Sequence, residues 1–145
     1  MVASKKISFE HENFPKGEYS IESAWAIPLE NNTFKLDNFL FYTTEYSWGD
    51  IVSVENREGE LFVTGLIKES GHSTVRIILN DQKDVEKTRD YLKSLGCDSE
   101  ISDVPILISV DIPPSVSYLQ IKNYLENGKK SSKWSYEEAC IAHRN

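Results

Sequence analysis

A histidine, a threonine and an arginine stand two residues apart in the segment Ser70-Gly71-His72-Ser73-Thr74-Val75-Arg76. Side chains of a β-strand alternate between its two faces, so His72, Thr74 and Arg76 are expected on one face. Arginine offers a planar fork of donors, and the hydroxyl and imidazole add more, which together suit an anion. The same alternation is typical of the solvent face of an antiparallel strand. The inward set would then be Ser73, Val75, Ile77 and Leu79.

A hydrolytic site needs a nucleophile held beside a general base. Ser70 and Ser73 flank His72, and Asp50 supplies a carboxylate. No G-x-S-x-G elbow occurs, however, and Ser70-Gly71-His72 is typical of a turn between strands. We therefore predict no catalytic residues.

Residue types that hold metals or cofactors are sparse. The chain has 2 cysteines, Cys97 and Cys140, and no spacing of cysteine and histidine fits a zinc site. Neither a G-x-G-x-x-G nor a Walker pattern occurs, and the glycines are spaced as turn or bulge glycines. We expect no metal and no cofactor.

Acidic and aromatic side chains gather in the stretch 45–60. Aromatic residues with acidic neighbours form binding hot spots for basic proteins, although aromatic residues also dominate hydrophobic cores. The candidate partner-binding residues are Glu45, Tyr46, Trp48, Asp50, Glu55, Glu58 and Glu60.

The charge balance favours a basic protein partner over a nucleic acid. The formal net charge is −7, and most of it lies in residues 1–70. Nucleic-acid binding depends on lysine and arginine neutralising phosphates. The one basic cluster, residues 129–134, is a small footprint for that purpose. An acidic surface instead speeds association with basic proteins, although many proteins are acidic for solubility alone.

Composition predicts a single soluble domain, residues 1–145. The chain is 39% hydrophobic and 27% charged, which is typical of a globular protein. No window approaches the roughly 18 apolar residues of a membrane span, and no secretory signal is visible. Two cysteines kept as free thiols suit a reducing compartment, so we expect a cytoplasmic protein.

Alternating patterns predict a β-rich half at residues 21–79, preceded by a peripheral segment at 1–20. Within that segment, Lys6-Ile7-Ser8-Phe9 is a candidate edge strand. Short strands joined by tight turns indicate a small bent antiparallel sheet or partial barrel. The predicted strands are 22–29, 33–36, 51–55, 60–67 and 72–79, and the last three read as a meander.

The period then changes, which predicts an α/β half at residues 80–145. A helix is expected from a cap at Asn80 or Asp81 to a stop at Gly96, and a second from Ser115 to a stop at Gly128. A strand is predicted at 104–112. The capping-box pattern Ser135-x-x-Glu138 predicts a last short helix through residue 142.

These elements predict an α+β fold in which the strand 72–79 serves both halves. The second half would be a strand–helix–strand–helix unit, like half of a ferredoxin-like fold. A right-handed crossover would place strand 104–112 parallel to strand 72–79 or one strand away.

Three segments resemble a bacterial domain-of-unknown-function family of small stand-alone proteins. They are Trp48-Gly49-Asp50-Ile51-Val52, Ser70-Gly71-His72-Ser73-Thr74-Val75-Arg76 and Trp134-x-Tyr136-Glu137-Glu138-Ala139-Cys140. The resemblance spans about residues 24–142 and implies no catalytic residues, because the family has no established activity. In general character the chain is also similar to immunity proteins, an analogy that rests on no motif.

Two functional hypotheses follow. In the first, the chain is a non-enzymatic immunity protein whose acidic and aromatic residues cover the active site of a basic toxin domain. In the second, it is a regulatory domain that binds a small molecule or anion through His72, Thr74 and Arg76.

Overall fold

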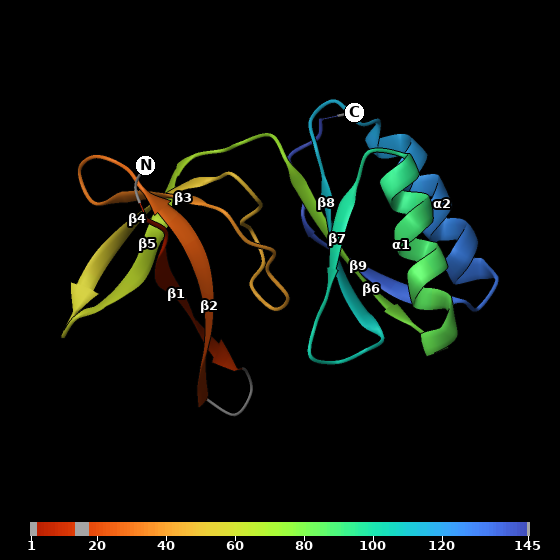
Figure 1. Cartoon of the computed structure of the whole chain (residues 1–145), viewed down its shortest axis with the longest axis horizontal. Coiled ribbons are helices and arrows are strands. Elements are labelled where there is room, and N and C mark those ends of the chain that lie inside the picture. The colour runs from red at the N-terminus through yellow and green to blue at the C-terminus, as the bar shows by residue number, and fades with distance from the viewer. Residues whose placement is uncertain (1–2, 14–17, 145) are drawn as a thin grey trace.

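The computed structural model describes residues 3–13 and 18–144. Five strands of the first half form a closed barrel in sequence order (Figure 1). They are β1 (Lys5–Asn13), β2 (Glu18–Pro28), β3 (Thr33–Leu36), β4 (Ile51–Arg57) and β5 (Glu60–Lys68). Neighbours in this order are antiparallel, and the barrel closes where β1 meets β5 in parallel, with Ser8 opposite Phe62.

Alternation along each strand fills the barrel with apolar side chains. Ile7 and Phe9 of β1 lie in this core, so the predicted edge strand is an integral part of the barrel and not peripheral. The core also contains Ala24, Ala26, Phe34, Leu36, Leu40, Val52 and Val54. A barrel of five strands is narrow, and the two alanines of β2 suit its interior.

The second half is a four-stranded sheet with two helices. Its elements are β6 (Ser73–Leu79), a 3₁₀ turn (Gln82–Asp84), α1 (Val85–Ser94), β7 (Asp98–Ile101), β8 (Leu107–Ile112), α2 (Tyr118–Lys130) and β9 (Trp134–Cys140). The strand order is β7-β8-β6-β9, and every pair is antiparallel. Both helices cover the same face of the sheet (Figure 1).

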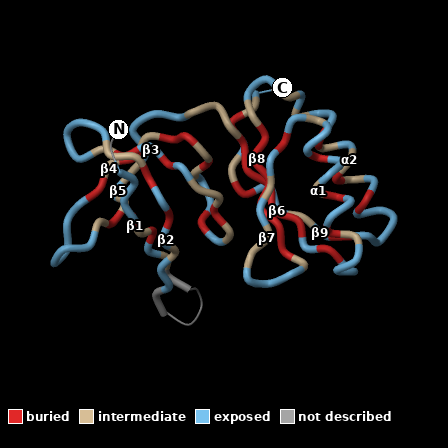
Figure 2. The backbone as a smooth tube through the Cα atoms, in the orientation of Figure 1, coloured by how far each residue is buried: buried red, intermediate tan, exposed pale blue. Residues whose placement is uncertain are grey.

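A second core lies between this sheet and its helices. Val75, Ile77 and Leu79 of β6 point into it, as the sequence predicts for the inward set. The helices contribute Val85, Leu92, Ile121 and Leu125, and β8 contributes Ile108, Val110 and Ile112. Burial is concentrated in the strands and on the inner faces of the helices (Figure 2).

The α+β class is therefore confirmed, but three details of the predicted topology are wrong. Among residues 3–13 and 18–144, β6 pairs only with β8 and β9, so it is not shared with the barrel, and the meander stops at β5. β8 runs antiparallel to β6 because an unpredicted strand, β7, reverses the chain after α1. The segment predicted as a last helix is strand β9. Its Ser135-x-x-Glu138 sequence matches a capping box, but the segment pairs with β6 and Trp134 at its start is buried.

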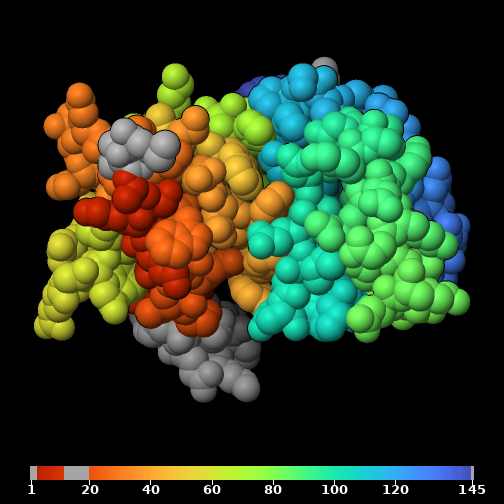
Figure 3. Space-filling view, viewed as in Figure 1, coloured from red at the N-terminus to blue at the C-terminus, as the bar shows by residue number. Residues whose placement is uncertain are grey.

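A loop of residues 37–50, between β3 and β4, fills the seam between the barrel and the sheet. Its residues Leu40, Thr43, Ser47 and Asp50 are buried. The side chains of the two halves abut across this seam in the space-filling view (Figure 3). The loop and the sheet face that it covers hold the polar residues singled out above.

No helix in the described part of the chain is long and apolar enough to cross a membrane.

Candidate functional site at the seam between barrel and sheet

Glu22 of β2 organises the seam loop from the barrel side. Its carboxylate accepts hydrogen bonds from the backbone N–H groups of Phe41 (2.7 Å), Tyr42 (3.2 Å) and Thr43 (2.7 Å). The Thr43 hydroxyl donates to the same carboxylate at 2.6 Å. Several N–H donors on one carboxylate fix the path of the chain, because the backbone groups would otherwise lack partners.

Arg76 of β6 holds the opposite side of the same loop. Its guanidinium donates to the carbonyl oxygens of Leu40 (3.2 Å), Thr43 (2.9 Å) and Tyr42 (3.4 Å). It also forms an ion pair with Glu137 of β9, with Nε–Oε1 at 2.8 Å and Nη2–Oε1 at 2.7 Å. All three nitrogens of the guanidinium group already donate to these partners, so no pair of N–H donors remains to bind an anion.

Thr74 also makes its hydrogen bond within the seam. Its hydroxyl lies 2.7 Å from the hydroxyl of Ser47, and both residues are buried. The face of β6 that carries Thr74 and Arg76 is therefore packed against the loop, and the expectation of a solvated face is wrong for these two residues. The prediction that Thr74 and Arg76 lie on the same face of the strand is confirmed, because strand side chains alternate between the two faces.

Asp50 ties the loop to the turn that leads into β6. One carboxylate oxygen accepts from the backbone N–H of Ser47 at 2.9 Å and the other from that of Ser70 at 2.8 Å. The Ser70 hydroxyl in turn donates to the Trp48 carbonyl at 2.7 Å. Asp50 is buried, so it belongs to the interior and is not available to a partner.

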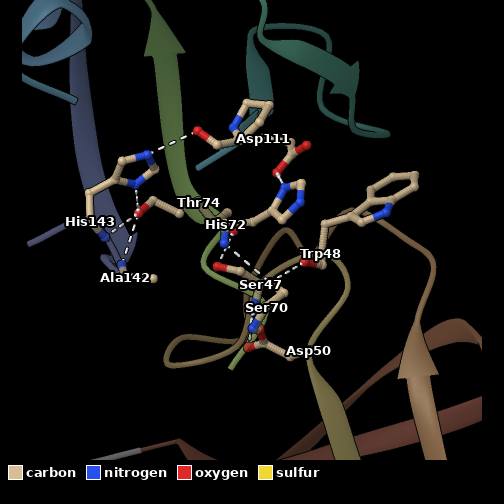
Figure 4. A network of polar contacts seen from close by, with 11 residues as sticks. Ser47, Trp48, Asp50, Ser70, His72, Thr74, Asp111, Ala142 and His143 are labelled. Atoms are coloured by element: carbon tan, nitrogen blue, oxygen red, sulfur yellow. Dashed lines mark hydrogen bonds and ion pairs between the residues drawn. The ribbon is translucent and has the colours of Figure 1, made fainter. Parts of the chain in front are cut away.

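His72 and Asp111 form a pair at the edge of the seam (Figure 4). His72 Nδ1 lies 2.7 Å from Asp111 Oδ1, and Asp111 sits on β8 with only 8% of its surface exposed. Burial raises the pKa of the Asp111 carboxyl, and the hydrogen bond with His72 opposes this by lowering that pKa. His72 is half-buried, and it is more exposed than Thr74 and Arg76, which are both buried.

Beside His72 lies a cavity of about 710 Å³ between the seam loop, α1 and β7. Phe39 and Trp48 of the loop form one wall, with ring centroids 5.1 Å apart at 72°. Figure 4 shows the His72 ring beside the Asp111 carboxylate, with Trp48 on its other side. Helix α1 adds charged side chains to the opposite wall, including Arg89 and Lys93.

Serine and histidine also meet at Ser73 and His143, but the arrangement is closed. Ser73 Oγ lies 2.6 Å from His143 Nδ1 and accepts from the backbone N–H of Ala142 at 2.8 Å. The other ring nitrogen of His143 donates to the Pro113 carbonyl at 3.0 Å. Ser73 is fully buried, so its hydroxyl cannot reach a substrate. In the described part of the chain, no group of three or more His, Cys, Asp and Glu residues could hold a metal ion.

The seven predicted partner-binding residues do not form one surface. Tyr46 packs against Phe9 of the barrel, with ring centroids 5.1 Å apart, and Trp48 lines the cavity. Glu45 is exposed on the seam loop, while Glu55, Glu58 and Glu60 are exposed around the β4–β5 turn. Figure 1 places that turn at the far end of the barrel from the sheet.

Sequence reasoning missed three acidic residues that organise the seam: Glu22, Asp111 and Glu137. Nothing in their neighbourhood distinguishes them, and Glu137 looked like a solvated member of a Glu-Glu pair. Each acquires its role from a partner more than eighteen residues away in the chain, such as the 61-residue separation between Arg76 and Glu137.

Comparisons with known proteins place the chain in a family. The model of a family described as Domain of unknown function (DUF4265) matches residues 22–136. The chain belongs to this DUF4265 family. No curated protein matches the chain. It is similar to a solved structure titled "Novel crystal structure of a hypothetical protein from Neisseria gonorrhoeae", with 21% identity over 97% of each chain and a TM-score of 0.83. At that identity the likeness shows that the DUF4265 chain and the neisserial protein share a fold.

Proposed function

We propose that this protein is a non-enzymatic protein-binding module, and in particular an immunity protein that neutralises a toxin domain in the bacterial cytoplasm by covering its active site. The observation that carries the proposal is the outer face of β2. Ile21 and Trp25 stand on this face, Leu29 follows just past the end of the strand, and the three remain 55%, 47% and 43% exposed.

This face reverses the usual distribution of side chains in a strand. Ala24 and Ala26 point into the barrel, while Ile21 and Trp25 point out on either side of the exposed Ser23. Single exposed apolar residues are common on protein surfaces, but three large exposed apolar side chains within one short stretch favour an interaction site. A tryptophan in such a stretch is the residue type most enriched in binding hot spots.

Acidic side chains border one end of this apolar row. Glu10 lies opposite Ile21 in the β1–β2 register. Arg57 forms ion pairs with Glu10 (Nη1–Oε2, 3.3 Å) and with Glu55 (Nε–Oε1, 2.7 Å). These ion pairs connect the β4–β5 turn to the apolar row. Glu58 and Glu60 extend the acidic border, which would steer a basic toxin surface towards the apolar row.

The partner surface proposed here therefore differs from the one predicted from the sequence. It keeps Glu55, Glu58 and Glu60, and it replaces the four seam residues Glu45, Tyr46, Trp48 and Asp50 by Ile21, Trp25 and Leu29. Lys6 lies over one side of Trp25, with its ammonium 5.4 Å from the ring centroid. The partner would contact the side of the indole that Lys6 leaves open.

The test is binding to the toxin-like protein encoded beside this gene. We expect Trp25→Ala to weaken binding at least about 30-fold, as loss of a hot-spot residue does, and to abolish protection of cells from growth arrest. Tyr91→Ala is a matched control, because Tyr91 on α1 is also 47% exposed. Biolayer interferometry gives both rate constants.

The acidic border makes a separate prediction in the same experiment. Reversing Glu58 and Glu60 to lysine should lower the association rate about tenfold at low salt and flatten its dependence on ionic strength. Equal binding by the Trp25→Ala protein, or an unchanged association rate after charge reversal, would contradict the proposed surface.

A further inference from the structure

The cavity beside His72 has two polar atoms with no partner. Among the described residues, Asp111 Oδ2 and His72 Nε2 make no hydrogen bond, whereas Asp111 Oδ1 and His72 Nδ1 are joined to each other. No buried side-chain nitrogen or oxygen of the described residues lacks a partner, so these two atoms are reached by solvent, and both residues line this cavity. An acceptor and an imidazole nitrogen are thus presented together at its floor.

The charge of the cavity wall decides which ligand suits this floor. Four carboxylate residues line it, against two permanently cationic ones. Arg89 pairs with Glu86 at 3.4 Å, and Lys93 pairs with Asp98. Asp111 at the floor and Asp90 at the exposed rim remain without a cationic partner other than His72. The unbalanced charge is negative, which disfavours an anion and favours a cation.

The aromatic residue on the cavity wall favours an organic cation over a metal ion as the ligand. Trp48 is half-buried and its indole faces the same cavity as the Asp111 carboxylate. A guanidinium or ammonium group is attracted both to the face of a tryptophan and to a carboxylate. A hydrated metal ion would make no use of the indole.

We propose that this cleft binds a guanidinium or primary ammonium group, with Asp111 and His72 at the floor and Trp48 at the wall. The site is separate from the β2 surface, and it uses His72, the most exposed residue of the predicted triplet. The cation could belong to a small amine or to a basic side chain of a protein, and both sources present the same chemistry.

Calorimetric titration of the intact protein tests the site. The probes are Nα-acetyl-argininamide and Nα-acetyl-citrullinamide, which differ only in that a neutral urea replaces the guanidinium. We expect saturable binding of the arginine compound and at least about tenfold weaker binding of the citrulline compound, because the carboxylate interaction is charge-assisted. Equal affinities, or no saturable heat with the arginine compound, would overturn the proposal.

Matched variants locate the binding within the cleft. Asp111→Asn should weaken it about tenfold and Trp48→Leu about fivefold, while Glu30→Gln and Tyr91→Leu remove a carboxylate and an aromatic ring elsewhere and should change nothing. Because Asp111 is buried, His72→Gln serves as a second floor variant if Asp111→Asn fails to fold. Undiminished binding in a folded floor variant would remove the cleft from consideration.

Two further probes distinguish the source of the cation. Agmatine carries the guanidinium without a peptide backbone, and acetyl-Ala-Arg-Ala-amide carries it within one. Tighter binding of agmatine would support a small-amine ligand, and tighter binding of the peptide would support capture of a protein side chain.

Discussion

At the scale of single residues, most groups that could do chemistry are committed to internal contacts. Asp50 accepts two backbone N–H groups, and Ser73 contacts His143 in the interior. Buried polar groups are expensive unless they are paired, so such residues are retained for structure as readily as for catalysis. His72 differs from them because it is half-buried and lines a cavity.

The environment of Cys97 lowers the reactivity of its thiol. It is fully buried, and burial, helped by the charges of Asp111 and Asp98, raises the pKa of its thiol to about 12. The thiolate is the reactive form, so the fraction available at pH 8 falls roughly a thousandfold relative to an ordinary cysteine. We expect Ellman's reagent at pH 8 to leave Cys97 unmodified in the native protein and to modify it fully in urea.

A Cys140→Ser variant isolates this measurement, because it leaves Cys97 as the sole thiol. Rapid labelling of that variant in the native state would show that Cys97 is accessible and would contradict the expected burial.

At the scale of elements, the sequence predicts what depends on local pattern and fails where distant contacts decide. The strands β2 to β5 and the helices α1 and α2 follow from alternation and period, although the cap of α2 is Ser117 and not the predicted Ser115. β9 does not, because Ser135-x-x-Glu138 matches a helix start while the strand is selected by pairing with β6, more than fifty residues earlier. The His72 triplet was placed on one face correctly, but its burial depends on a loop that no local pattern reveals.

Gly128 shows the same dependence within α2. The sequence predicts it as a helix stop, yet α2 continues to Lys130. A Cβ atom at this position would lie 2.0 Å from Cζ2 of Trp134, whose indole N–H donates to the Leu125 carbonyl at 3.0 Å. The glycine therefore lets the helix pack directly on the tryptophan of β9.

We expect Gly128→Ala to lower the free energy of unfolding by about 2 kcal/mol, measured with urea. Overpacking of the core lowers the free energy of unfolding by about 3 kcal/mol, and the better helix propensity of alanine raises it by about 1 kcal/mol. Asn127→Ala, at an exposed neighbouring position of the same helix, should be nearly neutral. Adding Trp134→Leu should cost less in the Gly128→Ala background than in the wild type, since the two residues share one space. Strict additivity would refute the contact.

At the scale of the whole molecule, two cores are joined by one loop that each half holds from its own side. Glu22 of the barrel binds the N–H groups of residues 41–43, and Arg76 of the sheet binds carbonyl groups of residues 40–43. Ser109 of β8 adds a hydrogen bond to the Leu40 carbonyl at 2.8 Å. The coupling between the barrel and the sheet therefore depends on a few polar contacts in addition to packing.

Arg76→Ala should weaken this coupling more than it weakens either core. Removing the side chain takes donors from the buried loop carbonyls and breaks the ion pair with Glu137, at a cost of about 3 kcal/mol. Arg57→Ala is the matched control, because Arg57 also forms ion pairs, with Glu10 and Glu55, but its side chain is 45% exposed, and its loss should cost less than about 1 kcal/mol.

Native-state hydrogen exchange reads the two cores separately. In the wild type, we expect core amides of β1 and β4 to exchange with the same free energy as those of β6 and β8, because the halves open together. In Arg76→Ala, exchange of the barrel amides should become easier than that of the sheet, since the loop that links them is released. If both cores lost the same protection, or if Arg57→Ala had an equal effect, the seam would be held by packing alone and Arg76 would not couple the two halves.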